Sequence, residues 1–201
     1  LKFANINSIS LNNFNNYKNS KAVFCNLPTS AYVKHINGKE FDLQHFIHSP
    51  NMYISTLENF LPYASILISS HYWDPKSPRL FKKNNIKKYN NLKVVGDISC
   101  DINGSIPTTL RVSNIQNPYY YIDRNTLGEV SKNSAALAIM AVDNLPSELP
   151  RDSSEEFSDG MVSEVLPYFI GSDDGRIKRA TITSNGKFCD LYKDLNNYIN
   201  N

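Results

Sequence analysis

Two apolar runs in the middle of the chain predict neighbouring strands. Residues 63–70 (YASILISS) and 93–99 (KVVGDIS) each hold consecutive apolar or small residues and end in serine or acidic positions. We expect a helix between them, from Ser77 or Pro78 to about Lys88. A strand, helix, strand order with nearly continuous apolar strands is typical of a parallel sheet covered on both faces. The middle of the chain therefore predicts a doubly wound α/β domain.

Shorter apolar runs predict three further strands, at residues 2–9, 21–27 and 137–142. In the last run alanine and methionine favour a helix, but its shortness and its abrupt end at Asp143 favour a strand, which we adopt. Residues 108–121 are expected to be extended or irregular and to end in a loop that contains the three tyrosines of residues 119–121. Residues 180–184, followed by Asn185-Gly186, predict a short strand and a turn.

Apolar residues at helical spacing predict three helices, at residues 52–61, from about residue 153, and at residues 190–199. In the first, the apolar positions are Tyr53, Leu57 and Leu61. In the second, Ser153 and Glu156 have the spacing of a capping box. One face of this helix then repeats every four residues, and we expect this stripe to pack in a core. Its members are Phe157, Met161, Val165 and Phe169.

The composition is that of an ordinary folded protein and excludes several classes. Of 201 residues, 41% are apolar, 20% charged and 11% aromatic, which argues against a disordered or a membrane protein. A chain of this length buries roughly 70% of its extended surface, enough for a sizeable core in one large domain or two small ones. The net charge of +2 gives no electrostatic case for binding nucleic acid.

Cysteine usage and hydropathy indicate a reducing compartment and no membrane. Cys25, Cys100 and Cys189 lie far apart without CxxC spacing or paired histidines, so neither a metal site nor a disulfide framework is expected. No apolar run approaches the roughly 20 residues of a membrane span, and the first residues lack the basic region of a signal peptide. Because the chain begins inside an expected strand, we expect it to be part of a longer protein.

Residues 93–107 form the strongest site candidate. The strand delivers Asp97, and the turn that follows, residues 100–105, adds Asp101. Open α/β sheets bind ligands beyond the carboxyl ends of their strands, which favours a site at this turn. The alternative is an Asx-turn that caps a buried strand. Of the two aspartates, Asp101 is the better placed to hydrogen-bond a substrate or a cofactor hydroxyl.

Three other positions are open between a site and a structural role. His71 follows the first apolar strand as either a site residue or a loop residue. Asp143-Asn144 is either a turn or a ligand-facing loop. Arg151, next to the expected amino end of a helix, either faces an anion or neighbours the cap. The chain contains no GxGxxG and no P-loop, so no phosphate cradle is expected within these residues.

Four stretches together resemble one family. They are VVGDISCDINGSI, LPYASILISSHYWDPKSPRL, AVDNLPSELPRDSSEEFSDGMVSEVLPY and ATITSNGKFCDLYKDLNNYI. They resemble the carboxyl-terminal half of lysine-ketoglutarate reductase, the lysine-forming, NADP-using kind of saccharopine dehydrogenase, which belongs with alanine dehydrogenase and the nicotinamide nucleotide transhydrogenase. The similarity covers residues 53–201 and, more faintly, residues 23–42.

The resemblance implies a fold and a set of site residues. Residues 1–150 would be the later part of a dinucleotide-binding Rossmann domain with a partial, doubly wound parallel sheet. Residues 151–201 would return to a second, discontinuous substrate domain. Asp101 matches the active-site aspartate of the DxxxDQGG turn in the alanine dehydrogenase branch, although Asn103 stands where the glutamine-glycine pattern has changed; Arg151 would bind a substrate carboxylate. The cofactor would be bound by Ser69, Ser70, Ile98, Ser99, Val142, Asn144 and Leu145.

The activity implied is the condensation of lysine with 2-oxoglutarate to saccharopine in lysine degradation, with hydride from NADPH. The alternatives are the NAD-dependent, lysine-releasing saccharopine dehydrogenase and a non-catalytic interaction or regulatory fragment. Asn5 and Asn7 stand where an NAD enzyme carries an acidic residue for the ribose, which favours NADP and leaves NAD open. The family's glycine fingerprint and its amino-terminal domain, with the proton-handling lysine and histidine, are missing. We therefore expect these residues alone to be inactive.

The implied partners are small molecules, namely lysine, 2-oxoglutarate and saccharopine. Neither nucleic acid nor a membrane is expected as a partner. Fusion to, or association with, a saccharopine dehydrogenase is left open, as is homo-oligomerisation. The expected compartment is the cytoplasm, or the mitochondrion if the source is eukaryotic.

Overall fold

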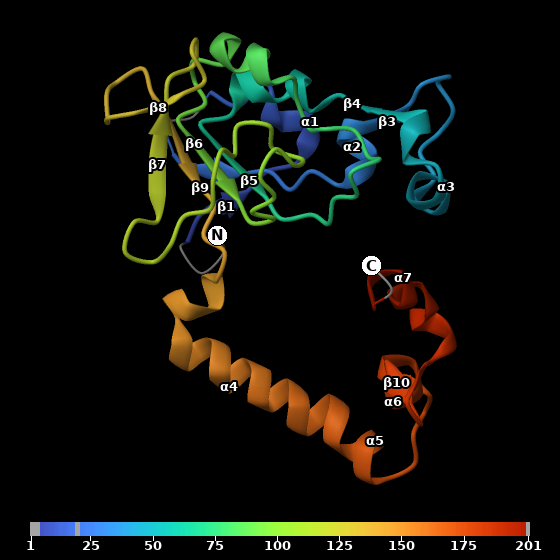
Figure 1. The fold of residues 1–201 in the computed structure, drawn as a ribbon. Helices are drawn as coiled ribbons and strands as arrows, with labels where there is room; N and C mark the ends of the chain where they lie inside the picture. Colours follow the sequence, from blue (N-terminus) through green and yellow to red (C-terminus); the bar gives the residue numbers. More distant parts are fainter. Residues whose placement is uncertain (1–4, 19–20, 200–201) are drawn as a thin grey trace. The chain divides into compact units, whose positions relative to one another are not determined.

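The computed structural model describes residues 5–18 and 21–199, and the chain divides into two units, residues 1–144 and 145–201 (Figure 1). This division lies six residues before the boundary expected after residue 150. The packing of the second unit on a substrate domain stays a prediction. Of the strand expected at residues 2–9, residues 2–4 lie outside the described residues.

A five-stranded sheet forms the centre of the first unit, in the order β5-β6-β9-β7-β8 (Figure 1). β5, β6 and β9 run parallel, whereas β7 pairs antiparallel with both β9 and β8. The α/β class and its parallel strands are confirmed, and two antiparallel strands extend the sheet. The strands are β5 (Ile66–Ser69), β6 (Val94–Asp97), β7 (Tyr119–Ile122), β8 (Glu129–Val130) and β9 (Leu137–Met140).

Apolar side chains hold β6 and β9 in the middle of this sheet. Val95 of β6 and Leu137 and Ile139 of β9 are fully buried. They share one core with Ile122 of β7 and with Leu92, which precedes β6. Burying an aliphatic side chain of this size contributes about 1.5–3 kcal/mol. The apolar runs at these two strands therefore predicted both the strands and their burial.

β5 is not buried on both faces, contrary to expectation. Ile66 and Ile68 are 59% and 51% exposed, and only Ser69 at the end of the strand is buried. β5 is the outer strand of the described sheet and pairs with β6 alone, from Ile66 opposite Val94 to Ser69 opposite Asp97. A continuous apolar run is the same for a central and an outer strand, so the pattern located the strand without fixing its burial.

Short elements make up the rest of the first unit. β1 pairs in parallel with β2, and β3 pairs antiparallel with β4, each pair forming a separate two-stranded sheet. The strands are β1 (Asn7–Ser8), β2 (Val23–Phe24), β3 (Val33–His35) and β4 (Tyr53–Ser55). The helices are α1 (Leu11–Phe14), α2 (Thr29–Tyr32), α3 (Leu43–His48) and the 3₁₀ helices η2 (Pro50–Met52), η3 (Leu57–Asn59), η4 (Leu61–Tyr63) and η5 (Lys83–Lys88).

The helix expected at residues 52–61 is wrong. Tyr53 begins β4, while Leu57 and Leu61 begin the separate 3₁₀ turns η3 and η4. All three side chains are buried, so their spacing predicted burial correctly but not backbone geometry. Hydrogen bonds of Ser55 help to hold this non-helical backbone: its hydroxyl donates to the carbonyl of Leu80 at 2.6 Å and accepts from the amide of Leu57 at 3.2 Å.

Two further expectations in this unit are corrected. Of the helix expected from residue 77 to residue 88, only η5 forms, because the amide of Leu80 instead donates to the carbonyl of Ser105 at 2.9 Å. The three tyrosines expected in a loop belong to β7, in which Tyr120 and Ile122 are buried and alternate with more exposed neighbours. That alternation is the ordinary pattern of a half-buried strand.

The second unit is mainly helical. Asn185-Gly186 forms the expected turn, between the antiparallel strands β10 and β11. None of the helices in the described part of the chain has the length and apolar character needed to cross a membrane. The elements are η6 (Leu145–Glu148), α4 (Pro150–Gly160), the π-helical turn η7 (Met161–Val165), α5 (Leu166–Ile170), α6 (Arg176–Ala180), β10 (Thr183–Ser184), β11 (Lys187–Phe188), η8 (Asp190–Leu195) and α7 (Asn196–Ile199).

Helix α4 differs from expectation in its start and in its apolar face. Pro150 occupies the first helical turn, and Ser153 lies inside the helix with its hydroxyl donating to the carbonyl of Pro146 at 3.0 Å, so the expected capping box is wrong. The apolar stripe exists, but Phe157 and Phe169 are 71% and 68% exposed. None of the side chains described between residues 145 and 199 is buried. The stripe is therefore not core packing within this unit.

Candidate active site

The carboxyl ends of β5, β6 and β9 meet at one edge of the sheet. Ser69 lies opposite Asp97 in the register, and the amide of Ile98 donates to the carbonyl of Ser69 at 2.8 Å. The thiol of Cys100 donates to the carbonyl of Val142 at 3.1 Å, which joins the turn after β6 to the segment after β9. Several residues predicted from the sequence are thus brought together at this edge.

Asp97 anchors the turn from inside the protein. It is fully buried, and its Oδ1 accepts from the amide and the hydroxyl of Ser99 at 3.1 and 2.6 Å. Its Oδ2 accepts from the hydroxyl of Thr109, also fully buried, at 2.6 Å. The Asx-turn alternative is therefore correct for Asp97, and the hydroxyl of Ser99 is engaged by this carboxylate. Sequence reasoning missed Thr109, because a partner twelve residues away has no local signal.

The turn after Asp97 presents Asp101 to solvent. Cys100 and Asn103 adopt left-handed conformations with φ of 56° and 55°, and the amide of Gly104 donates to the carbonyl of Asp101 at 2.8 Å. A Cβ at Gly104 would lie 2.3 Å from the Cβ of Asp101, so this position requires glycine. The Asp101 side chain is exposed, and no hydrogen bond from another described residue reaches its carboxylate. Asp101 is thus positioned by a tight turn and free to bind.

His71 belongs to the same edge. Its Nδ1 lies 3.0 Å from the Ser69 hydroxyl, and its Nε2 is buried without a hydrogen-bond partner among the described residues. Burial lowers the pKa of His71, and this effect outweighs the opposing charges of Asp97 and Asp101. The imidazole is therefore neutral at pH 7. The sequence had left His71 open, and the geometry places it beside the site.

Cys100 does not have the properties of a nucleophile. Burial raises the pKa of its thiol, and the carboxylates of Asp97, Asp143 and Asp101 raise the pKa further. A thiol with a raised pKa is protonated at neutral pH and weakly reactive. No cluster of three or more metal-binding side chains occurs within the described ranges.

The remaining predicted residues lie in two places. Ser70 and Asn144 are exposed, after β5 and at the end of the first unit respectively. Leu145 and Arg151 belong to the second unit. Arg151 is exposed on α4, and its Nε donates to Glu155 at 2.9 Å, one turn along the helix. This pair is a surface ion pair of the ordinary i, i+4 kind.

The fold and the polar edge beyond its parallel strands define a Rossmann-like α/β domain. The family model for the alanine dehydrogenase/PNT, C-terminal domain matches residues 26–187. The chain therefore belongs to this family, whose members bind nicotinamide cofactors.

Three curated relatives that the chain matches are alpha-aminoadipic semialdehyde synthases. The chain is 28% identical over 202 residues to the alpha-aminoadipic semialdehyde synthase of Arabidopsis thaliana, a match that covers 95% of the chain and 19% of the relative. It is 27% identical over 175 residues to the mitochondrial alpha-aminoadipic semialdehyde synthases of Rattus norvegicus and Bos taurus. Each of these matches covers 72% of the chain and 19% of the relative. The chain thus spans about a fifth of the length of the curated relatives it matches. The resemblance stated from the sequence is confirmed.

Proposed function

We propose that this chain is the carboxyl-terminal part of a lysine-ketoglutarate reductase, a longer enzyme that condenses lysine with 2-oxoglutarate and reduces the product to saccharopine. The observation that carries the proposal is the edge beyond β5, β6 and β9, where Ser69 pairs with Asp97, Cys100 bonds to Val142, and the tight turn between Cys100 and Gly104 presents the Asp101 carboxylate, which accepts no hydrogen bond from another described residue. Membership of a nicotinamide-binding family and similarity to alpha-aminoadipic semialdehyde synthase support it.

The proposed reaction is a condensation followed by a reduction. The ε-amine of lysine adds to the ketone carbon of 2-oxoglutarate, and loss of water leaves an imine. A nicotinamide cofactor held at the strand ends would supply the hydride for the imine carbon, and protonation of the nitrogen would complete saccharopine. In this scheme Asp101 positions the lysine-derived nitrogen or orients the water that is lost.

The residues present fit the nicotinamide end of a cofactor. Small side chains and main-chain groups of Ser69, Ser70, Ile98 and Ser99 lie at the strand ends, where open α/β sheets bind ligands. The buried Nε2 of His71 adds a polar group that no described residue of the chain hydrogen-bonds. In this proposal Val142, Asn144 and Leu145 complete the cofactor contact from the segment after β9.

Replacement of Asp101 tests the proposal. Asp101→Asn in the full-length enzyme should lower turnover by about tenfold or more, since the amide has nearly the same shape but no charge with which to position the substrate amine or water. Asp143→Asn removes an equivalent charge from the same edge and should have a smaller effect on turnover. Circular dichroism should show the native fold in both variants. Wild-type turnover in Asp101→Asn would contradict the proposed role.

Cofactor choice separates the proposed enzyme from its runner-up. Faster saccharopine formation with NADPH than with NADH supports the lysine-forming reductase, which the absence of a carboxylate at Asn7 in β1 favours. Preferred use of NAD with release of lysine would assign the chain to the other saccharopine dehydrogenase. The full-length enzyme should be assayed in both directions with both cofactors.

The second unit supports a proposal about domains. Its exposed apolar stripe on α4 and α5 fits a segment that packs on a substrate domain. Arg151 engages Glu155 through Nε, which leaves its other donors for a substrate carboxylate. Arg151→Ala should raise the KM for 2-oxoglutarate more than it lowers kcat, and Glu155→Gln is the control. Fusion to a saccharopine dehydrogenase and a cytoplasmic or mitochondrial location remain part of the proposal.

A further inference from the structure

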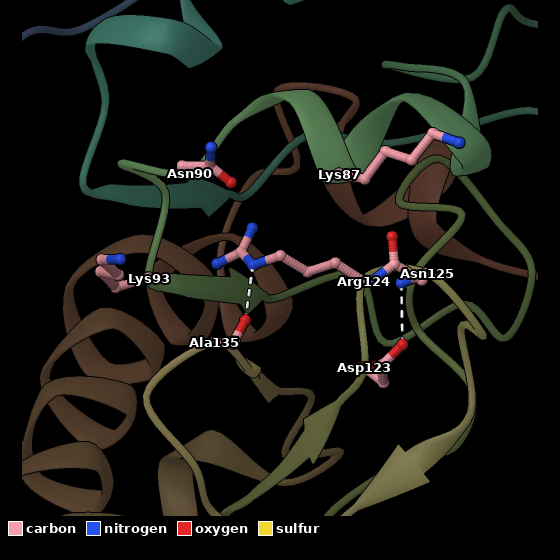
Figure 2. A pocket seen from close by; sticks show the side chains of 7 residues that line it. All are labelled: Lys87, Asn90, Lys93, Asp123, Arg124, Asn125 and Ala135. Atoms are coloured by element: carbon pink, nitrogen blue, oxygen red, sulfur yellow. Dashed lines mark hydrogen bonds between the residues drawn. The ribbon is translucent and has the colours of Figure 1, made fainter.

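A cavity lies at the edge of the central sheet opposite the candidate active site. Lys93 directly precedes β6, and Ala135 lies two positions before β9, so the cavity is at the amino ends of these parallel strands, whereas Asp101 follows the carboxyl end of β6. Its volume is about 370 Å³. The lining residues are Lys87, Asn90, Lys93, Asp123, Arg124, Asn125 and Ala135 (Figure 2).

Arg124 is the central group of this cavity. Its side chain is buried, with only 8% of the residue exposed. Nε donates to the carbonyl of Ala135 at 2.8 Å, Nη1 to the carbonyl of Tyr89 at 3.2 Å, and Nη2 to the carbonyl of Leu92. These bonds use three of the five N–H groups of the guanidinium and leave two. In the view of Figure 2 the guanidinium is drawn between Asn90 above and Ala135 below, with the Lys93 side chain to the left.

The charge of Arg124 is not neutralised by the protein. No carboxylate forms an ion pair with it among the described residues. Through these three carbonyls Arg124 joins the segment after η5 to the segment before β9, but a carbonyl dipole carries only a partial charge. A buried cation without a counter-charge is costly, so a bound anion would stabilise this arrangement.

The surrounding side chains add to the positive charge. Lys87 and Lys93 line the cavity and are exposed. Asp123 is the acidic residue of the lining, and its Oδ1 accepts from the amides of Asn125 and Thr126 at 2.9 and 2.8 Å, which closes the turn that carries Arg124. Three cations and one carboxylate give the lining a net charge of +2.

We propose that this cavity binds a phosphate dianion, either free or as the monoester of a small molecule, through Arg124, Lys93 and the side-chain amide of Asn90. A dianion matches the net charge of the lining. Phosphate also places four oxygens around one centre, so donors from two separate segments, residues 90–93 and Arg124, reach it at once. The cavity is larger than a phosphate ion and has room for the organic part of a monoester. This site is independent of the proposed reductase activity.

Calorimetric titration of the purified full-length protein with inorganic phosphate, at ionic strength held constant with sodium chloride, tests the site. Saturable binding should weaken by about tenfold in Lys93→Gln, because one charge-assisted contact is lost. Lys88→Gln is the matched control, since Lys88 lies on η5 next to Lys87 but does not line the cavity. It should bind phosphate as the wild type does.

Two comparisons complete the experiment. Titration with glycerol phosphate distinguishes the two ligands. If the cavity binds it more tightly than inorganic phosphate, the ligand is a phosphate monoester; if it binds it more weakly, the ligand is the free ion. Asp101→Asn, at the opposite sheet edge, should leave phosphate binding unchanged whatever it does to turnover. Equal phosphate binding by wild type and Lys93→Gln, tighter binding of succinate than of either phosphate, or no saturable binding by the wild type would each overturn the proposal.

Discussion

The neighbouring threonines 108 and 109 provide a matched pair with opposite expected effects. Both are fully buried in the first unit. The Thr109 hydroxyl donates to Asp97 Oδ2 at 2.6 Å, whereas the Thr108 hydroxyl has no hydrogen-bond partner among the described residues. Valine replaces the hydroxyl by a methyl group of nearly the same size, so neither substitution creates a large cavity.

The magnitudes follow from these contacts. Thr109→Val leaves an oxygen of a buried carboxylate without its donor, and a hydrogen bond to a charged group contributes about 1.5–3 kcal/mol to stability. Thr108→Val removes a hydroxyl whose burial is uncompensated, which should leave the free energy of unfolding unchanged or raise it by about 1 kcal/mol. The two variants should therefore differ by about 1.5–4 kcal/mol.

Urea unfolding measures this difference. Trp73, the single tryptophan of the chain, lies in the first unit, so its fluorescence reports the unit that contains both threonines. The urea midpoint of Thr109→Val should fall, and that of Thr108→Val should rise or stay at the wild-type value. The slope of the free energy of unfolding against urea concentration should be unchanged in both variants. Equal destabilisation by both substitutions would refute the assignment of Asp97 as an anchor that depends on Thr109.

Two further predictions concern Glu58 and Gly104. Burial raises the pKa of Glu58, but hydrogen bonds from the amide of Lys82 and from two side chains outweigh it and hold the pKa below 4.5. The carboxylate therefore stabilises the fold above that pH and the contribution is lost as the pH falls, so Glu58→Gln should flatten the acid side of the stability profile measured by urea midpoints from about pH 3 to pH 7. Gly104→Ala should displace Asp101 and lower turnover as well as stability, because the new Cβ would lie 2.8 Å from the Asp101 carbonyl oxygen. At Gly160 the new Cβ would meet no atom within 4 Å outside its own helix backbone, so Gly160→Ala should instead stabilise α4 by roughly 0.5–1 kcal/mol. Equal losses of stability in the two alanine variants would contradict this steric argument.

Apolar periodicity predicted which residues are buried better than it predicted the backbone that buries them. Tyr53, Leu57 and Leu61 are core residues, as their spacing indicated, but a hydrogen bond from Ser55 to Leu80 helps hold a strand and two 3₁₀ turns in place of a helix. In α4 the error is the reverse. Phe157 lies on a helix as predicted, but the described residues of its unit do not cover it.

The site was predictable to the extent that it depends on strand ends. The serine and acidic residues that end β5 and β6 marked the edge at which Ser69 and Asp101 lie. The sequence favoured Asp101 over Asp97 as the binding aspartate, but it did not predict how Asp97 is anchored, because that depends on Thr109, twelve residues away. The bond between Ser69 and His71 likewise depends on a side-chain rotamer that residue types alone do not specify.

Strand β5 has a practical consequence for handling this chain. Its outer side presents main-chain donors and acceptors next to the exposed Ile66 and Ile68, a combination that templates intermolecular strand addition. Preparations of the isolated chain should consequently form β-rich aggregates as the concentration rises. A single Ile68→Lys substitution should suppress them, since a charged outer strand resists being joined by a second copy.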